Sequence, residues 1–254
     1  MNKFHIIVPF YNVEKWITNC IKSIQGQKYK NYSVTLVNDC STDNTVEIIN
    51  ELVKKDDRFK LIHTKENGGA LNSTFTGILT ANPDDEDIII VLDGDDWFAQ
   101  KKSLDIVSDA YNETGCLVTY GSYITFPKKE RGKFSRQIPD WVLEKKLFRQ
   151  NPWMSSHLRT FKFKLWDAIK KKDILNQEGK IYAMAGDLPV IFPMLEMAEE
   201  RSHFINDIVH VYNRANPLNE DKVNHALQLS IEKEVREKEV YPRFEEVKND
   251  KKNK

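Results

Sequence analysis

Short apolar runs and longer amphipathic stretches follow one another through the first 115 residues. Four short runs rich in apolar residues predict strands; they lie at Phe4–Phe10, 33–37, Phe59–His63 and 88–92. The run at 88–92 is apolar throughout, which is typical of a parallel strand covered on both faces of a sheet. Between them, apolar residues recur at intervals of three and four, as along one face of a helix. Strands that alternate with helices predict an α/β fold with a mostly parallel, Rossmann-like central sheet flanked by helices.

Each predicted helix begins after a polar loop. We expect Asn12 to cap the first helix, with Glu14 in its first turn, and Thr42-Asp43 to open the second. The third follows Asn67-Gly68-Gly69, and its predicted buried face carries Leu71, Phe75, Ile78 and Leu79. The next helix is expected at 101–112.

Beyond residue 115 the pattern is less regular. It predicts strands and helices at 116–125, 157–162, 165–171, from Asp187 onward and at 204–212. We expect a mobile loop at residues 127–156. This segment contains a charge cluster followed by Trp141 and Trp153. This loop is either a plain surface excursion or a lid whose aromatic side chains contact a sugar. From residue 219 the chain is dense in charge and predicts a mostly helical tail with a frayed lysine-rich end from Lys248.

Composition limits the classes of function. The 38 basic and 38 acidic side chains cancel, so no overall charge favours a nucleic acid or an anionic membrane as partner. Three widely spaced cysteines, Cys20, Cys40 and Cys116, predict neither a disulfide framework nor a zinc site. Because no apolar run approaches membrane-spanning length and the N-terminus does not resemble a signal peptide, we expect a cytoplasmic protein without a transmembrane segment.

The fourth apolar run ends in three carboxylates, Asp93, Asp95 and Asp96. In parallel sheets, ligands gather beyond the carboxyl ends of the strands. Asp93 and Asp95 can turn toward one hard divalent cation there, and Gly94 lets a phosphate or sugar approach the backbone. The alternative is a solvated acidic turn or a helix cap.

Four ordered motifs resemble the GT-A glycosyltransferases, family 2 in particular. They cover roughly residues 4 to 100 and lie at predicted strand ends or helix starts; they read Val8-Pro9-Phe10-Tyr11-Asn12-Val13-Glu14-Lys15-Trp16-Ile17, Val37-Asn38-Asp39-Cys40-Ser41-Thr42-Asp43-Asn44-Thr45, Asn67-Gly68-Gly69-Ala70 and Leu92-Asp93-Gly94-Asp95-Asp96. The resemblance implies a GT-A domain at 1–218, with a nucleotide-sugar-binding half at 1–115 and an acceptor half at 116–218, before the tail at 219–254.

The resemblance also implies roles for single residues. Pro9, Phe10, Tyr11, Glu14 and Asp39 would bind the nucleoside of a UDP- or GDP-sugar, because a carboxylate can accept from a base N–H and an aromatic ring can stack on the base. The Asn67-Gly68 turn and Gly94 belong to the same donor site. Asp93 would bind the ribose or a metal-bound water, and Asp95 would bind the Mn²⁺ or Mg²⁺ that bridges the diphosphate oxygens.

An inverting member of this family needs a carboxylate base at a helix start well after the Asp-Gly-Asp motif. Asp187 occupies that place, with Gly186 where a glutamate is usual. It would deprotonate the hydroxyl of a glycan, protein or lipid-linked acceptor. The alternative is that Asp187 only caps its helix ahead of Pro189. Weaker candidates for the base are Glu178, Asp173 and Asp140.

His157 and Arg159 are further candidates for the donor site. They would complete the metal shell or grip the diphosphate, or else they are structural residues beside Trp153. The same two roles, in the donor site or in the structure, remain open for His210, Tyr212 and Arg214.

Three other functions compete with glycosyl transfer. A sugar-1-phosphate nucleotidyltransferase needs a glycine-rich loop where Pro9-Phe10-Tyr11-Asn12 stands. A phosphatase of the haloacid dehalogenase type usually has Thr or Val where Trp97 stands. A non-catalytic nucleotide-sugar or glycan-binding module would have little reason to keep Asp93, Asp95 and Asp187 together.

Overall fold

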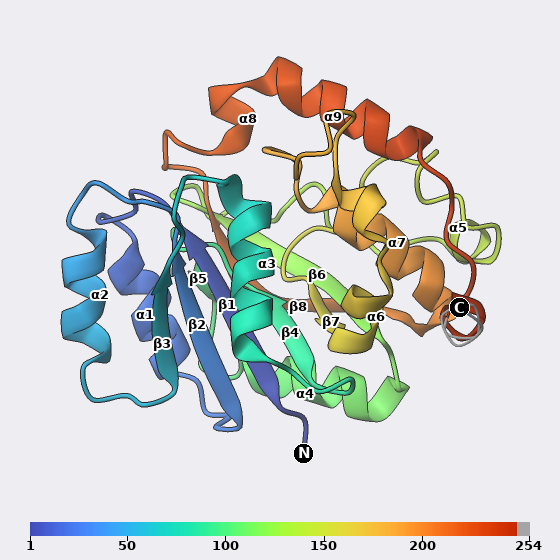
Figure 1. Ribbon diagram of the computed structural model, residues 1–254. Helices are drawn as coiled ribbons and strands as arrows, with labels where there is room; N and C mark the ends of the chain where they lie inside the picture. The colour runs from blue at the N-terminus through green and yellow to red at the C-terminus, as the bar shows by residue number, and fades with distance from the viewer. Residues whose placement is uncertain (248–254) are drawn as a thin grey trace.

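The protein is built around one eight-stranded sheet with helices on both faces, as the sequence predicts (Figure 1). The computed structural model describes residues 1–247, apart from the side chains of 220 and 221. The strand order is β3-β2-β1-β4-β7-β6-β8-β5. Four strand pairings are parallel and three, each involving β7 or β5, are antiparallel.

The first half of the chain forms the regular part of the sheet. Its strands are β1 (Phe4–Phe10), β2 (Tyr32–Asn38), β3 (Phe59–His63) and β4 (Ile88–Val91). Alternate side chains of β1 enter two different cores: Ile7 packs toward α3, and Phe4, Ile6 and Val8 pack toward α1 and α4. This burial on both faces explains why β1 and β4 are almost continuously apolar, whereas the edge strand β3 is only partly buried and includes Lys60.

The helices cover the two faces unequally. Helices α3 (Gly69–Ala81), α6 (Phe163–Ala168) and α7 (Leu188–Ala198) lie on the near face in Figure 1, whereas α1 (Ile17–Gln25) and α4 (Ser103–Thr114) lie behind the sheet. Helix α2 (Thr45–Val53) packs against α1 at the edge. Within residues 1–247, no helix is long and apolar enough to span a bilayer.

Two helix starts were predicted too early. Helix α1 begins at Ile17, not after Asn12, because Asn12 adopts a φ of +51° and its side chain accepts from the Thr42 amide instead of capping α1. Helix α2 begins at Thr45, where the Asp43 carboxylate accepts from the Thr45 amide and hydroxyl. On α3, Leu79 was expected on the buried face but is 76% exposed.

Four further strands complete the sheet, and two of them, β5 and β7, run antiparallel to their neighbours. The four are β5 (Trp97–Phe98), β6 (Val118–Phe126), β7 (Thr160–Lys162) and β8 (Ser202–Asn213), with the short helices α5 (Asp140–Glu144), η1 (Lys171–Ile174) and η2 (Glu199–Arg201) between them. The predicted loop at 127–156 therefore contains α5. Its two tryptophans differ, since Trp141 is half exposed and Trp153 packs edge-on against Phe192 of α7.

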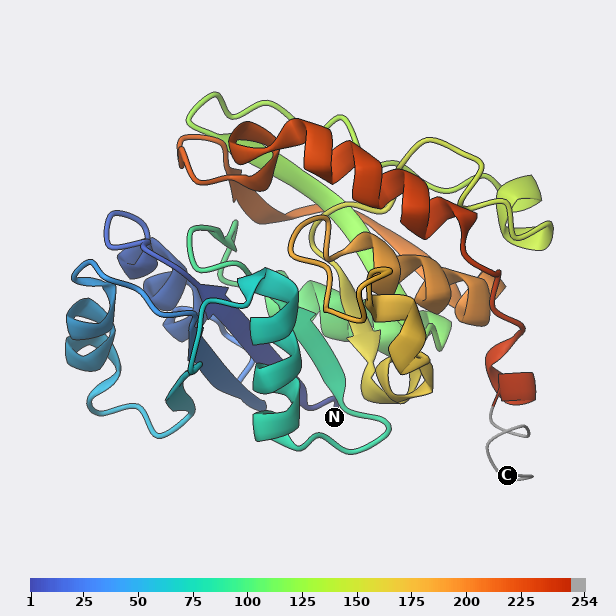
Figure 2. The ribbon, with the colours of Figure 1, turned by 45° about the horizontal axis from the view of Figure 1, so that its top comes forward.

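The segment predicted as a helical tail lies against the domain. It contains α8 (Glu220–Val223) and α9 (His225–Glu237), and α9 lies along α7 in Figure 2. Ile231, Val235 and Tyr241 belong to the same hydrophobic core as α7, whereas Leu227 of α9 is exposed. The division of the chain at 218 stays a prediction, and the frayed end expected from Lys248 lies outside the described residues.

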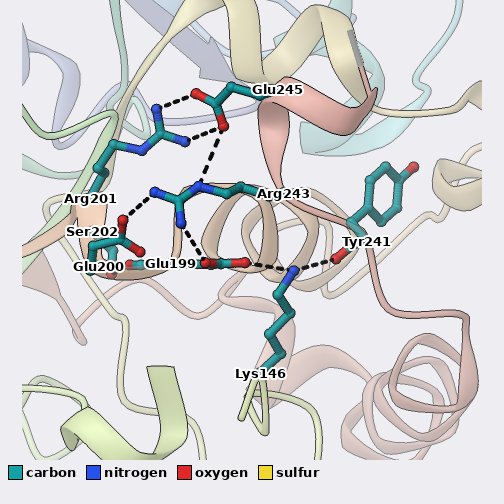
Figure 3. A network of polar contacts seen from close by, with 8 residues as sticks. All are labelled: Lys146, Glu199, Glu200, Arg201, Ser202, Tyr241, Arg243 and Glu245. Atoms are coloured by element: carbon teal, nitrogen blue, oxygen red, sulfur yellow. Dashed lines mark hydrogen bonds and ion pairs between the residues drawn. The ribbon is translucent and has the colours of Figure 1, made fainter. Parts of the chain in front are cut away.

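Ionic contacts fix the C-terminal segment. At their centre, Arg149 Nε and Nη2 donate to the two oxygens of Glu196 at 2.5 and 2.9 Å, and both side chains are buried. The Tyr241 amide donates to Glu196 at 3.0 Å. A second, more exposed network joins Lys146, Glu199, Glu200, Arg201, Arg243 and Glu245 (Figure 3).

The buried pair predicts a large effect on stability. Glu196→Gln should lower the free energy of unfolding by about 3–5 kcal/mol, because it leaves the Arg149 guanidinium buried without its counter-charge. Urea denaturation measures this. Glu245→Gln is the matched control, since its pair with Arg201 is partly exposed and worth about 0.2–1 kcal/mol. Equal effects of the two substitutions would contradict the assignment.

Candidate functional site

A cleft of about 560 Å³ opens beyond the carboxyl ends of β1, β2 and β4. Parallel strands place their C-terminal loops at one edge of the sheet, which brings motifs far apart in sequence into one cavity. The residues predicted for the site that line this cleft are Pro9, Phe10, Tyr11, Asp39, Asn67, Asp93, Gly94, Asp95, His157, Arg159 and Asp187. Glu14 and Gly68 are not among its lining residues.

Asp39 holds the turn that starts α3. One carboxylate oxygen accepts from the Thr64 hydroxyl at 3.0 Å and the Gly68 amide at 3.1 Å, and the other accepts from the Gly69 amide at 2.8 Å. Gly68 therefore contributes its amide to Asp39 and not a surface to the cleft. Gly69 needs to be glycine, since its φ is +82°.

Glu14 joins two loops at the edge of the site. Its carboxylate accepts from the backbone and side-chain amides of Asn44 at 3.1 and 3.0 Å. The Glu14 amide in turn donates to Asp43 at 3.1 Å. The prediction that Glu14 contacts the nucleoside has no support in this geometry, because the side chain faces the start of α2.

Gly94 has a packing reason to be glycine, besides the predicted approach of a phosphate or sugar to its backbone. A Cβ atom at this position would lie 2.5 Å from the Cβ of Phe10. The glycine therefore allows the acidic turn to pack against the end of β1 and so determines where its carboxylates lie. It lines the cleft, but close packing alone excludes every larger residue here.

The carboxylates of Asp93 and Asp95 are held in a poorly solvated place. Burial and then the nearby Asp95 carboxylate raise the pKa of Asp93 to about 6. Burial and then Asp96 raise the pKa of Asp95 to about 7, although Asn216 donates to Asp95 at 2.7 Å. Each ionised carboxylate is thus destabilised by low solvation and by a like charge, and a divalent cation would offset both.

Asp96 turns away from the cleft into a buried network. Its oxygens share a 2.8 Å hydrogen bond with His210 Nε2 and accept from the Asn213 amide at 2.7 Å. The His210 ring stacks on His157 at 4.8 Å between centroids, and His157 stacks on Tyr212. Burial lowers the pKa of His210 to about 3 and, with the Arg159 charge, holds the pKa of His157 well below its usual value, so both rings are neutral.

A second group of side chains that could bind a metal ion consists of Asp96, His157 and His210. Their possible ligand atoms all lie within 4.8 Å of one another. Two features argue for a structural role. The Asp96 oxygens are already engaged with His210 and Asn213, and the imidazole planes are only 10° from parallel, so their in-plane lone pairs do not converge on one ion. This network attaches the acidic turn to β8.

Asp187 does not cap its helix. It occupies the N-cap position of α7, but its side chain makes no capping hydrogen bond. Instead, Arg159 Nη1 donates to its carboxylate at 2.5 Å, and Arg159 Nη2 lies 3.1 Å from His157 Nε2. The cap alternative is therefore wrong. Gly186 is required by packing, since a Cβ there would lie 2.8 Å from the Cβ of Leu71.

The weaker candidates for a base lie elsewhere. Glu178 is exposed and pairs with Lys180. Asp173 accepts from the Tyr241 hydroxyl, and Asp140 lines a separate small pocket beside η2. Asp187 is thus the one of these four carboxylates that lines the cleft.

Sequence patterns missed Asn216 and the pairing of Asp96 with His210, both of which shape the site. Asp96 was expected beyond the strand together with Asp93 and Asp95, and its partner His210, an open candidate for the donor site, lies 114 positions later. Asn216, which holds Asp95, lies 121 positions later. The histidine and asparagine stand in a late strand and its following loop, and nothing in local spacing marks them as partners of the acidic turn.

The model of Glycosyl transferase family 2 matches residues 5–176, more than half of the chain. The chain belongs to this family. It is a glycosyltransferase, and this membership excludes the phosphatase and the nucleotidyltransferase alternatives.

Its curated relatives are bacterial glycosyltransferases. The chain is 25% identical to glycosyltransferase GlyG of Streptococcus pneumoniae serotype 4 over 82% of this chain and 70% of that protein. It is 27% identical to GlyA of the same organism over 83% of this chain, but over only 30% of that longer protein.

Solved structures show the same fold. S. aureus TarS 1–349 in complex with UDP-GlcNAc has a TM-score of 0.63 and 22% identity, over 84% of this chain and 59% of TarS 1–349. The mannosyltransferase PcManGT from Pyrobaculum calidifontis, in complex with GDP-Man and Mn²⁺, has a TM-score of 0.61 and 18% identity, over 96% of this chain and 67% of PcManGT. These likenesses confirm the GT-A fold of the glycosyltransferase.

Proposed function

We propose that this glycosyltransferase moves a sugar from a UDP- or GDP-sugar to a hydroxyl of a glycan, protein or lipid-linked acceptor, with inversion and with Mn²⁺ or Mg²⁺. One observation carries the proposal: Asp93, Asp95 and Asp187, which come from two distant parts of the chain, line the same cleft as the Tyr11 and Asp39 side. The complexes of TarS with UDP-GlcNAc and of PcManGT with GDP-Man and Mn²⁺ support the donor class.

The nucleoside would lie against the loop after β1. Pro9, Phe10 and Tyr11 line this side, and the Tyr11 ring is partly exposed and available for stacking on a base. Asp39 has one oxygen bonded to the Gly69 amide alone, so a second lone pair of that oxygen can accept from a base or ribose. Asn67, in the turn before α3, also lines the cleft.

The cation would be held by Asp93 and Asp95. Their oxygen donors suit Mg²⁺ or Mn²⁺, and a cation would offset the burial and like-charge repulsion that raise the pKa of both carboxylates. When bound, the cation would supply charge stabilisation to the departing nucleoside diphosphate. Asn216 keeps Asp95 oriented, and the Asp96 network keeps the turn in place.

Asp187 would act as the general base. Inversion requires that the acceptor hydroxyl attack the anomeric carbon from the side opposite the diphosphate while it loses its proton to a carboxylate. Arg159 fixes the orientation of that carboxylate through a charge-assisted hydrogen bond, and neutral His157 lies at hydrogen-bond distance from Arg159 on the other side. Arg159 would thus act as a positioning residue of the base, and its charge also lowers the pKa of Asp93.

A panel of nucleotide-sugars with Mn²⁺ tests the proposed function. Release of nucleoside diphosphate should occur with a UDP- or GDP-sugar and should stop when the cation is chelated. Release without any cation would remove the metal from the proposal. A non-catalytic module would bind a donor of the panel and release nothing.

Asp39→Ala should lower the affinities for the free nucleoside and for the complete nucleotide-sugar by the same factor, on the order of ten- to a hundredfold. The substitution removes a charged hydrogen-bond acceptor and releases the turn at Gly69. Titration calorimetry with uridine, guanosine and the donor measures this. Glu14→Gln is the matched control and should leave these affinities unchanged, since Glu14 lies off the cleft. An effect of Asp39→Ala on the sugar portion alone would contradict its role.

A further inference from the structure

Two loops leave the sheet together beside the cleft. Strands β6 and β8 pair in parallel up to their last residues. The Arg214 amide then donates to the Phe126 carbonyl at 2.9 Å, so the loops that follow the two strands begin side by side (Figures 1 and 2). The loop after β8 carries Leu218 and Val223, which line the cleft and are exposed, and so mark its mouth. The loop after β6, residues 127–136, therefore starts next to this mouth.

Residues 127–136, called the basic loop from here on, concentrate positive charge. Five of these ten residues are basic and one is acidic, although the whole chain has no net charge. All five are exposed, and within the described part of the chain none forms an ion pair; they are Lys128, Lys129, Arg131, Lys133 and Arg136. Arg131 donates to two uncharged partners, the Ser122 hydroxyl at 2.7 Å and the Asn206 carbonyl at 3.0 Å. This charge is therefore available to attract an anionic partner.

The backbone of the basic loop is attached to the body of the protein. The Gly132 amide donates to the Tyr123 carbonyl of β6 at 2.9 Å. At the end of the loop, the Arg136 amide donates to the Met154 carbonyl at 3.3 Å. These contacts hold the basic side chains in one region of the surface.

Exposed apolar side chains accompany the charge. Phe134, in the basic loop, is 58% exposed. On the neighbouring loop, Leu218 and Val223 are 44% and 62% exposed. Residues 214–223 include two basic and two acidic residues, so this loop adds apolar surface but no net charge. Single exposed apolar side chains are common, whereas several of them beside a cluster of unpaired basic residues mark an interaction surface.

We infer that the basic loop and the loop after β8 dock on the surface of an anionic lipid bilayer, with the mouth of the cleft beside it. The basic side chains contact the headgroups, and Phe134, Leu218 and Val223 enter the boundary between headgroups and acyl chains. A nucleic acid would use the charge and stack on Phe134, but it would leave the two aliphatic side chains in water. The inference goes beyond the proposed function and does not depend on it.

Co-sedimentation with lipid vesicles tests the docking. The full chain is mixed with vesicles of phosphatidylcholine, or of phosphatidylcholine with phosphatidylglycerol, without any nucleotide or divalent cation. We expect the partition coefficient for the anionic vesicles to exceed that for the neutral ones on the order of a hundredfold at low salt. The ratio should fall as salt is added, because salt screens exposed charges.

Neutralising substitutions assign the binding to the basic loop. The triple variant Lys128→Gln, Lys129→Gln and Lys133→Gln should bind the anionic vesicles on the order of a hundredfold more weakly, at about fivefold for each lysine. All three side chains are exposed, so the fold should persist. Phe134→Ser should weaken binding about three- to tenfold, by a factor that added salt does not reduce, because it removes apolar contact and no charge.

The matched control removes the same charge elsewhere. Lys54, Lys55 and Lys60 are also exposed, and they lie between α2 and β3 or on β3 itself. Strand β3 forms one edge of the sheet, whereas β6 and β8 lie toward the other. The triple variant Lys54→Gln, Lys55→Gln and Lys60→Gln should bind the anionic vesicles nearly as the wild type does.

Four results would overturn the inference. They are no binding to anionic vesicles, equal binding to both kinds of vesicle, equal losses in the two triple variants, and binding to polyphosphate as tight as to vesicles and unaffected by Phe134→Ser. The last result would assign the basic loop to a polyanion. Because no donor or cation is present, each of these failures leaves the proposed function in place, and an absence of nucleoside diphosphate release would likewise leave the docking in place.

Discussion

Asp187→Asn should lower the rate of sugar transfer by about a hundred- to ten-thousand-fold, the usual contribution of a general base. The amide has nearly the same volume, and its oxygen can still accept from Arg159, so only the ability to take a proton is lost. The affinity for the donor should not change. Steady-state transfer rates, with donor affinities from titration, measure the two effects separately.

Glu178→Gln is the control for this substitution. It makes the same chemical change in the segment before α7, at a side chain that is exposed and lies off the cleft. It should leave transfer unchanged. Near wild-type transfer by Asp187→Asn would show that another group takes the proton, although none of the other candidates for the base, Glu178, Asp173 and Asp140, lines the cleft.

Asp95→Ala should reduce binding of the nucleoside diphosphate with Mn²⁺ to the level seen without the cation. Asp95 lies beyond β4 and outside the hydrophobic cores, so the fold should persist. Loss of a carboxylate also relieves repulsion at Asp93, which favours stability and makes unfolding a poor explanation for lost binding. Thermal shift with UDP or GDP, with and without Mn²⁺, measures the outcome.

Asp109→Ala provides the comparison, since this exposed carboxylate on α4 lies on the opposite side of the sheet. It should bind the diphosphate and cation as the wild type does. Unchanged cation-dependent binding by Asp95→Ala would move the metal away from the Asp93–Asp95 pair, and the Asp96, His157 and His210 set would become the candidate.

Strands β1 and β4 could be predicted closely because burial on both faces leaves a nearly continuous apolar run. The bounds of β1 (Phe4–Phe10) and of the partly exposed edge strand β3 (Phe59–His63) agree with the predicted ranges. The topology then dictates that loops after parallel strands share one edge. This is why Tyr11, Asp39 and Asp93, which are far apart in the chain, were expected together and do line one cleft.

Contacts between loops could not be predicted in the same way. Asn12 and Glu14 have the chemistry of a helix start, but both bond to the loop before α2, and α1 begins later. Asp96 has the chemistry of a metal ligand, but a histidine on β8 binds it in the core. In each case a side chain has several suitable partners, and packing, not spacing, decides among them.

The most direct test of the account is a crystal structure of the protein with UDP or GDP and Mn²⁺, with the cation located by anomalous scattering. We expect manganese bound by Asp95 and Asp93, with the diphosphate beside it. The uracil or guanine ring should lie against the side of the cleft formed by Tyr11 and Asp39. Manganese bound instead by Asp96, His157 and His210, or a nucleotide outside this cleft, would contradict it.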